Sequence, residues 1–182
     1  MKPLLFTRVR EVRKPNRANS GDAGIDFYVP HLTDEDIRKI PQNENQMHQG
    51  NLRFKYDDNE NIRISLAPGG RVLIPSGVRV LIDPRESMLM AANKSGVATK
   101  RGLLYTAEIV DSTYTGEVHI GVFNSSPQRV DISLTHDEKL MQFVHVPVIL
   151  STPVEVTEEQ YKAFEDNWGT RGASGFGSSD NK

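Results

Sequence analysis

The feature that most constrains the fold of this chain is a succession of short segments rich in β-branched and aliphatic residues, separated by Gly, Pro and Asn. Residues 2–12 alternate imperfectly between apolar and charged positions, which is the period of a half-buried strand. Further segments of this kind span residues 70–82, 103–111, 116–124, 128–134 and 140–150. Many short strands divided by turns predict an all-β fold, a distorted jelly-roll or β-clip-like sandwich.

Two other local patterns stand beside these strands. Pro75, Ser76 and Gly77 divide residues 70–82 into two predicted strands, because proline cannot donate to a sheet ladder and glycine relaxes the backbone. Residues 157–166 predict one short helix near the C-terminus, capped by Thr157 and with acids in its first turn. Residues 33–40 also resemble a helix start with acids in the first turn.

The length of 182 residues fits one β domain, expected over residues 1–168, with an insertion inside it and an arm after it. Residues 31–66 are rich in Asp, Glu, Asn and Gln and are interpreted as the insertion; their one convincing apolar alternation is Ile62, Ile64 and Leu66. A solvated surface loop is the favoured interpretation, and a partner-recognition arm is the alternative. Residues 169–182 are glycine-rich and predict a flexible C-terminal arm.

Composition excludes several classes of function. The chain has no cysteine, which removes disulfides, thiolate catalysis and cysteine-based metal sites. Its histidines lack the spacing of a zincin site, so hard cations held by oxygen remain the open metal chemistry. A net charge of -2 and a pI of about 6.2 give no field that attracts duplex nucleic acid. Because no apolar run approaches the roughly 20 residues of a bilayer span and no signal peptide is evident, a cytoplasmic location is expected.

Two segments in the middle of the chain carry candidate chemistry. Lys94, Ser95 and backbone amides near Gly96 suit phosphate oxygens, although turns of this composition are often only turns. Asp111 follows an apolar strand, and Tyr114 comes three residues later, before a Thr-Gly turn. A hairpin there could place a water-activating carboxylate beside a ring that packs under a sugar; a β-turn with an Asx cap is the alternative.

The glycine-rich tail carries a third candidate. Arg171 offers a planar fork of donors for phosphate, Phe176 can stack on a base, and the glycines between them let the backbone approach a ligand. Together they suggest a lid that closes over a nucleotide. A plain disordered terminus is the alternative.

Taken in order, five segments resemble the five motifs of the trimeric dUTPase family. They are Ala23-Gly-Ile-Asp-Phe, Asn93-Lys-Ser-Gly-Val-Ala, Ile109-Val-Asp-Ser-Thr-Tyr-Thr-Gly-Glu, Lys139-Leu-Met-Gln-Phe and Arg171-Gly-Ala-Ser-Gly-Phe-Gly-Ser-Ser. Five motifs in order, from Ala23 to Ser179, are far more specific than any one alone. The family implies a jelly-roll-like homotrimer whose sites each combine motifs from different subunits, with the last motif arriving as a swapped arm.

The resemblance implies a dUTP diphosphatase that hydrolyses dUTP to dUMP and pyrophosphate with Mg2+ as its cofactor. By resemblance, Asp111 activates the water that attacks the α-phosphorus, and Tyr114 packs beneath the deoxyribose and excludes a 2′-hydroxyl. The resemblance also implies that backbone groups between Ile109 and Val118 recognise uracil. Magnesium is held mainly by the triphosphate, and Asp26 assists it through its water shell.

The resemblance also implies the contacts to the phosphates and to the closing arm. Gln142 lies beside the phosphates or near the catalytic water, Arg171 clamps the terminal phosphate, and Phe176 covers the uracil. The full implied substrate-binding set is Lys94, Ser95, Gly96, Ile109, Tyr114, Glu117, Val118, Gln142, Arg171, Phe176, Gly177 and Ser178.

Some positions depart from the usual family pattern. Glu108 and Asp137 stand where glycine is usual, and Thr113 and Thr115 replace an acid and a basic residue. Lys94 and Lys139 replace arginines, and lysine lacks the bidentate fork of arginine.

Two rival functions remain open. A dCTP deaminase of the same superfamily needs a glutamate general base on the strand after the hairpin, and Val118-His-Ile-Gly-Val-Phe-Asn holds no acid. A regulatory binding module on this fold could use the insertion at 31–66 to recognise a protein partner, which need not exclude catalysis. No nucleic-acid or membrane partner is expected.

Overall fold

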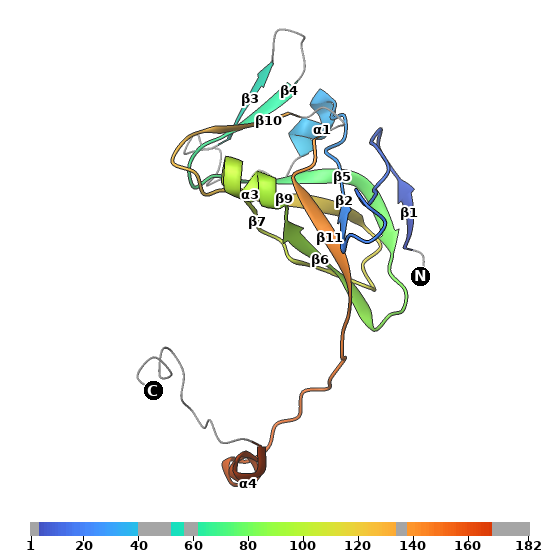
Figure 1. Ribbon diagram of the computed structural model, residues 1–182, viewed down its shortest axis with the longest axis vertical. Helices are drawn as coiled ribbons and strands as arrows, with labels where there is room; N and C mark the ends of the chain where they lie inside the picture. The colour runs from blue at the N-terminus through green and yellow to red at the C-terminus, as the bar shows by residue number, and fades with distance from the viewer. Residues whose placement is uncertain (1–3, 40–51, 57–61, 134–137, 169–182) are drawn as a thin grey trace. The chain divides into compact units, whose positions relative to one another are not determined.

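The computed structural model describes residues 4–39, 52–56, 62–133 and 138–168 (Figure 1). The chain divides into two compact units, Met1–Ile149 and Leu150–Lys182. This division lies earlier in the chain than the boundary expected at Gly169, because the last strand of the first unit ends at Pro147. The segment that carries the C-terminal helix therefore belongs to the second unit.

The first unit is built from three antiparallel sheets. The first sheet has the strand order β1-β5-β9-β7 and consists of Leu5–Arg8, Arg71–Leu81, Glu117–Asn124 and Leu103–Tyr105. The second has the order β2-β11-β6-β8 and consists of Gly24–Asp26, Met141–Pro147, Ser87–Asn93 and Ile109–Asp111. The third has the order β10-β4-β3 and consists of Val130–Ser133, Ile62–Leu66 and Leu52–Tyr56. This architecture confirms the predicted all-β class.

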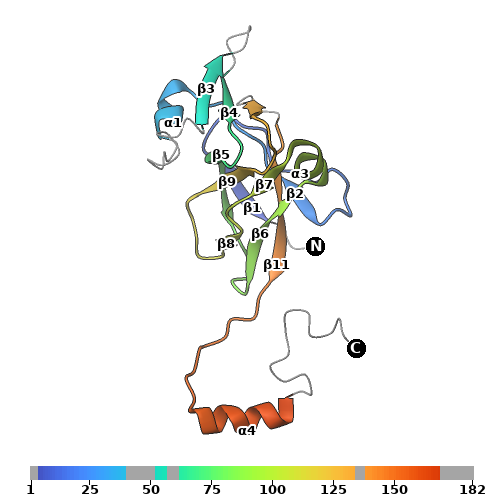
Figure 2. The ribbon, with the colours of Figure 1, turned by 90° about the vertical axis from the view of Figure 1, so that its left-hand side faces the viewer.

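Three helices accompany the described strands: α1 (Asp34–Lys39), α3 (Ser95–Arg101) and α4 (Glu158–Trp168). The predicted C-terminal helix is confirmed, and its cap is reciprocal: the amide of Gln160 donates to Thr157 Oγ1 at 3.2 Å, and the amide of Thr157 donates to Gln160 Oε1 at 2.9 Å. The sequence did not predict α3, which follows β6 after a single residue (Figure 2). No helix in the described part of the chain is long and apolar enough to span a bilayer.

One hydrophobic core cluster combines buried side chains from all three sheets. Burial alternates along β9, where Val118, Ile120 and Val122 are each no more than 1% exposed. The rings of Phe27 and Phe143 pack at 4.7 Å between centroids. Each fully buried side chain of this size contributes roughly 1.5–3 kcal/mol, so this apolar centre holds the strands that carry the polar groups of the site.

The described part of the insertion is not a solvated loop, and that expectation was wrong for these residues. Ile64 and Leu66 are fully buried, and Ile37 and Leu52 are each 8% exposed. β4 lies between β10 and β3, with Ile64 opposite Ile132. The apolar alternation at the end of the insertion therefore marks a central strand of the third sheet.

The predicted break at residues 75–77 is a bulge inside one strand rather than a gap between two. β5 pairs with β9 on both sides of it, and the register shifts between Pro75 and Arg79. Gly77 has φ 73°, a left-handed conformation that glycine adopts without strain. A Cβ at position 77 would lie 2.8 Å from Val12 Cγ1, so this turn needs glycine for space as well.

Candidate functional site

A pocket of about 230 Å³ lies where the chain passes from the second sheet to the first. Strand β8 ends at Asp111, and the hairpin that follows returns as β9 at Glu117. The pocket is lined by Leu73, Ala107, Ile109, Val110, Asp111, Tyr114, Glu117, Val118, His119 and Phe143. It thus brings together the predicted catalytic residue and four of the residues predicted to contact the nucleoside.

The Asp111 carboxylate is exposed, and no hydrogen bond or ion pair from a described residue engages it. Two contacts of the turn set its position: the amide of Tyr114 donates to the Asp111 carbonyl at 3.0 Å, and the Ser112 side chain, through Oγ, donates to the carbonyl of Arg85 at 2.8 Å. The segment is therefore a turn that also forms a wall of the pocket, and among the described residues the Asp111 side chain does not form the Asx cap of the alternative interpretation. A fixed backbone with a free carboxylate is suited to holding water.

Tyr114 is held against the turn that follows it. Its hydroxyl donates to the carbonyl of Glu117 at 2.9 Å, and its ring remains 44% exposed. A Cβ at Gly116 would lie 2.4 Å from Tyr114 Oη, so the ring occupies the space that glycine leaves. The exposed face of this ring is an apolar platform beside Asp111.

For two further residues that line the pocket, the structure differs from the prediction made from the sequence. The side chain of Glu117, a predicted substrate contact, accepts hydrogen bonds from Arg10 and from the amide of Gly77, so its backbone is what it offers to a ligand. His119 also lines the pocket, and its Nδ1 donates to the Glu117 carbonyl at 2.9 Å, since a carbonyl only accepts. Period-two alternation from Glu117 was the signal that could have found His119.

A second polar cluster surrounds Asp26 at the end of β2. Asp26 is 3% exposed; its Oδ1 accepts a hydrogen bond from the Lys94 ammonium, and its Oδ2 accepts one from Lys139 Nζ at 3.0 Å. The hydrogen bond to Asp26 raises the pKa of Lys139 above its usual range, against the lowering effect of burial. Arg13 and Lys139 lie over the ring of Tyr28, at 4.9 and 5.6 Å from its centroid.

Gln142 joins this cluster from the neighbouring strand β11. It lies opposite Asp26 in β2 and opposite Ala92 in β6, and its Nε2 donates to the carbonyl of Asn93 at 2.9 Å. The side chain covers Gly24, where a Cβ would meet Gln142 Oε1 at 1.9 Å. Lys94 precedes the first turn of α3, in which Ser95 and Gly96 are exposed. The structure thus places the described residues predicted to bind phosphate, Lys94, Ser95, Gly96 and Gln142, near one another, and the two ammonium groups of the cluster suit an anionic ligand.

The pocket and this cluster are not brought together within one chain. Asp111 lies opposite Met88 at the beginning of β6, whereas Lys94 follows the other end of that strand. Six residues of extended chain separate these positions, which corresponds to roughly 20 Å. One triphosphate cannot contact both groups in a single copy of the described chain.

Other predicted residues fall outside this geometry. Arg171, Phe176, Gly177 and Ser178 lie outside the described residues. Within the ranges that the structure describes, no group of three or more His, Asp or Glu residues could cage a metal ion. Asp26 is the acid predicted to act toward magnesium, and both of its oxygens already accept hydrogen bonds from lysine, so it fits an outer-sphere role through water.

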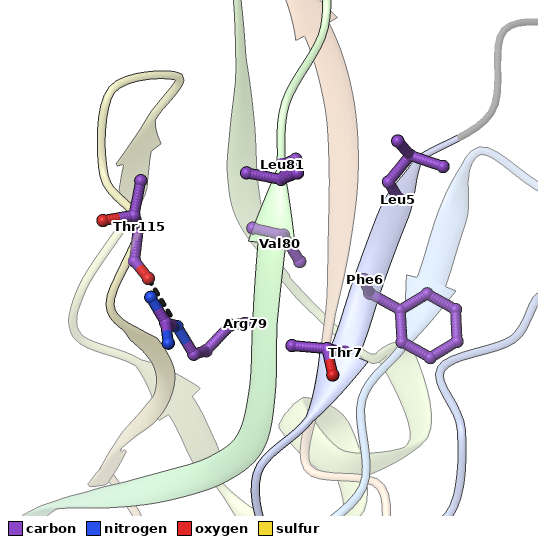
Figure 3. A pocket seen from close by; sticks show the side chains of 7 residues that line it. All are labelled: Leu5, Phe6, Thr7, Arg79, Val80, Leu81 and Thr115. Atoms are coloured by element: carbon purple, nitrogen blue, oxygen red, sulfur yellow. Dashed lines mark hydrogen bonds between the residues drawn. The ribbon is translucent and has the colours of Figure 1, made fainter.

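A second hollow of about 290 Å³ lies against β1 and β5 and shares no lining residue with the first (Figure 3). Leu5 and Leu81, which pair across these strands, are 56% and 58% exposed. Arg79 Nε donates to the carbonyl of Thr115 at 2.7 Å and so anchors the tip of the Asp111 hairpin. The lining contains no acid and no histidine, so it offers no base to activate the hydroxyl of Thr7 or Thr115.

Comparison with solved structures establishes the fold type. The dUTPase of Staphylococcus bacteriophage 80alpha with dUPNHPP aligns with a TM-score of 0.64 at 20% identity, covering 98% of each chain. The dUTPase from phage phi11 of S. aureus, described as showing a species-specific insert, aligns with a TM-score of 0.59 at 19% identity, covering 86% of this chain and 97% of that one. In fold, this is an all-β protein of the dUTPase type.

Sequence comparison then gives the family. A family model described as dUTPase matches residues 55–180. The deoxyuridine 5'-triphosphate nucleotidohydrolase of Mycolicibacterium vanbaalenii is 29% identical over 172 residues, covering 93% of this chain and 89% of its own length. The protein of the same name from Hahella chejuensis is 33% identical over 121 residues, covering 65% and 74%. The chain belongs to the dUTPase family.

Proposed function

We propose that this protein hydrolyses dUTP to dUMP and pyrophosphate. The observation that carries the proposal is the exposed Asp111 carboxylate, which no described residue engages, at the edge of a nucleoside-sized pocket of about 230 Å³. Membership of the dUTPase family supports the same reaction, since the relatives from M. vanbaalenii and H. chejuensis are named for it.

Asp111 acts as the general base. Its carboxylate accepts a proton from a water molecule while the water oxygen forms a bond to the α-phosphorus. The bond between that phosphorus and the oxygen that bridges to the β-phosphorus breaks, and pyrophosphate leaves with the electron pair. A positioned base of this kind contributes about 10²- to 10⁴-fold to the rate.

The pocket selects the nucleoside. The exposed ring of Tyr114 packs beneath the deoxyribose and leaves no room for a 2′-hydroxyl. Backbone groups between Ile109 and Val118 form hydrogen bonds with the uracil edge, and the side chains of Leu73 and Phe143 give the base an apolar floor.

The Asp26 cluster binds the phosphates. Asp26 holds the ammonium groups of Lys94 and Lys139 in place, so that little side-chain entropy is lost when phosphate oxygens arrive. Ser95 and Gly96 add a hydroxyl and backbone amides, and Gln142 orients oxygens or the attacking water. From the arm, Arg171 clamps the terminal phosphate, Phe176 covers the uracil, and Gly177 and Ser178 add hydrogen bonds.

Magnesium is the proposed cofactor; bound with the triphosphate, it would supply positive charge against the charge that develops on the phosphates. Asp26 would hold water molecules of its hydration shell, which accords with the preference of magnesium for retained waters and few protein ligands.

Assembly as a homotrimer completes the site. Because roughly 20 Å of β6 separates Asp111 from Lys94 in one copy, the catalytic carboxylate of one subunit meets the phosphate cluster of another. Apolar residues between the last strand and α4 support an interface: Ile149 is 93% exposed, Leu150 71% and Val154 77%. A folded domain seldom leaves a run of this kind uncovered.

Replacing one carboxylate tests the proposal. Asp111→Asn keeps the size of the side chain but removes the base, so kcat for dUTP should fall about 10²- to 10⁴-fold. Asp131→Asn is the matched control; it removes an exposed acid on β10 and should leave kcat unchanged. If Asp111→Asn hydrolyses dUTP at the wild-type rate, Asp111 is not the general base. If the protein releases ammonia from dCTP, its reaction is deamination instead.

A further inference from the structure

The carboxylate of Glu117 is the most heavily hydrogen-bonded acid near the nucleoside pocket. Glu117 Oε1 accepts the amide of Gly77 at 2.6 Å and Arg10 Nε at 2.8 Å, and Oε2 accepts Arg10 Nη2 at 3.1 Å. The Arg10 and Glu117 side chains are 24% and 17% exposed. A two-pronged, partly buried pair of this kind fixes the orientation of both groups.

The bulge in β5 explains why a carboxylate is needed here. The register between β5 and β9 shifts between Pro75 and Arg79, so the amide of Gly77 has no partner in the ladder. Glu117 supplies the missing acceptor. Arg10 then neutralises that carboxylate, and the hydrogen bonds with Glu117 raise the pKa of Arg10 against the lowering effect of burial.

The third nitrogen of the same guanidinium reaches the insertion. Arg10 Nη1 donates to Asp36 Oδ1 in α1, which gives an ion pair. Asp36 Oδ2 accepts the amide and the hydroxyl of Thr33, at 3.1 and 2.8 Å, and the amide of Asp36 donates back to Thr33 Oγ1 at 3.2 Å. Asp36 is thus at once the capping acid of α1 and the partner of Arg10.

Glu117 also connects this network to the ligand pocket. Its backbone carbonyl accepts the hydroxyl of Tyr114 and the ring of His119, both at 2.9 Å, and these three residues line the pocket. A change in the position of Glu117 therefore moves the platform on which the sugar is proposed to rest. Asp111 stands on β8, in the other sheet, and has no bond to Arg10.

We propose that Arg10 is a positioning residue for the nucleoside pocket. It acts through Glu117 to hold the Tyr114 platform and, through Asp36, makes helix α1 of the insertion part of the support. The expected change in KM rests on the proposed function, whereas the expected change in the order of residues 111–118 rests on the described contacts alone. Arg10 is not itself one of the residues that line the pocket; its contact with the lining is the bond to the Glu117 carboxylate.

The kinetic consequence separates binding from chemistry. Among the described contacts, loss of the two-pronged bond leaves the Glu117 carboxylate held only by the amide of Gly77, so more of the order of the platform must be gained when the nucleotide binds. KM for dUTP should therefore rise about tenfold in Arg10→Met, while kcat, which depends on Asp111, changes less than about twofold. Arg10→Lys restores the charge without the fork and should recover part of the loss.

Control variants make the test specific. Arg8→Met makes the same change two residues earlier and should leave KM unchanged, because among the described residues Arg8 Nη1 donates to the carbonyl of Val12 at 2.9 Å and not to Glu117. Asp36→Asn weakens the ion pair between Arg10 and α1 but leaves the bond between Arg10 and Glu117. It should therefore raise KM by about threefold, less than Arg10→Met does. Thermal unfolding of each variant, measured at one protein concentration, identifies those that fold.

Amide hydrogen exchange gives a readout that does not depend on turnover. In Arg10→Met the amides of residues 111–118 should exchange faster, while those of β6 keep wild-type rates. Unchanged KM and unchanged exchange in folded Arg10→Met overturn the proposal, as does an equal acceleration throughout the chain. If Arg10→Met does not fold, the same comparison is decided by Arg10→Lys and Asp36→Asn. If the wild type does not hydrolyse dUTP, the proposed function fails, and the exchange result still decides the role of Arg10.

Discussion

Replacement of Gly77 by alanine tests how the bulge in β5 supports the fold. Gly77 has φ 73°, and a Cβ there would lie 2.8 Å from Val12 Cγ1 and 3.1 Å from Arg10 Cβ. The amide of Gly77 that donates to Glu117 remains in the alanine variant, so that hydrogen bond does not have to be lost. The substitution therefore probes backbone strain and crowding together.

The two costs can be estimated separately. A left-handed conformation costs a non-glycine residue about 1–2 kcal/mol. Crowding against Val12 adds about 1–3 kcal/mol, the usual range for overpacking. The reduced freedom of the unfolded chain returns about 0.4–1 kcal/mol. Gly77→Ala should therefore destabilise the protein by about 1–4.5 kcal/mol, with a middle value of about 3 kcal/mol.

Two other glycines separate the contributions. Gly69 also has φ 73°, but a Cβ at this position would have no neighbour within 4 Å, so Gly69→Ala should cost only about 1 kcal/mol. Gly96 has neither a left-handed φ nor a neighbour within 4 Å, and Gly96→Ala in α3 should be neutral or slightly stabilising. Urea unfolding at one protein concentration measures all three. Equal losses for Gly77→Ala and Gly69→Ala would refute the role assigned to contact with Val12.

Three further results are expected. Hydrogen bonds from Thr33 and Arg10 outweigh burial and lower the pKa of Asp36, so its stabilising effect is present above its usual pKa of 3.8 and is lost as pH falls through the lower folded value. The difference in urea midpoint between wild type and Asp36→Asn should therefore vanish in strong acid; a difference that persists there contradicts this. Gly116→Ala, whose Cβ would lie 2.4 Å from Tyr114 Oη, should raise KM for dUTP by about tenfold, and an unchanged KM would show that the ring position is unimportant. Lys139→Met should weaken pyrophosphate binding about tenfold and leave deoxyuridine binding unchanged in calorimetry; equal losses for both ligands would remove Lys139 from the phosphate site.

Local signals in the sequence predicted much of the sheet structure. The alternation at residues 116–124 became β9, and Thr157 with its following acids became the capped helix α4. The interruption at Pro75 was located correctly but misinterpreted, because a bulge and a chain break share the same local composition. β6 and α3 were not predicted, since Met and Ala in the strand and Gly in the helix oppose their usual propensities.

The sequence predicted only those parts of the candidate site that depend on residues close together in the chain. Asp111 and Tyr114 do line one pocket, as a hairpin at this point required. The hydrogen bond between Arg10 and the Glu117 carboxylate could not be predicted, because the two residues lie 107 positions apart in the sequence. The same holds for Asp26, whose partner Lys139 is 113 residues away. Such pairs are set by tertiary packing of strands that are distant in sequence.

Mixing two inactive variants tests most directly whether the site is divided between copies of the chain. Asp111→Asn lacks the base and Lys94→Met lacks a phosphate contact, so each alone should be nearly inactive. If each site takes Asp111 from one subunit and Lys94 from the next, co-refolding equal amounts should restore about a quarter of wild-type activity, because that fraction of sites combines two unaltered residues. Activity no higher than that of the separate variants would show that both residues serve a site within one chain.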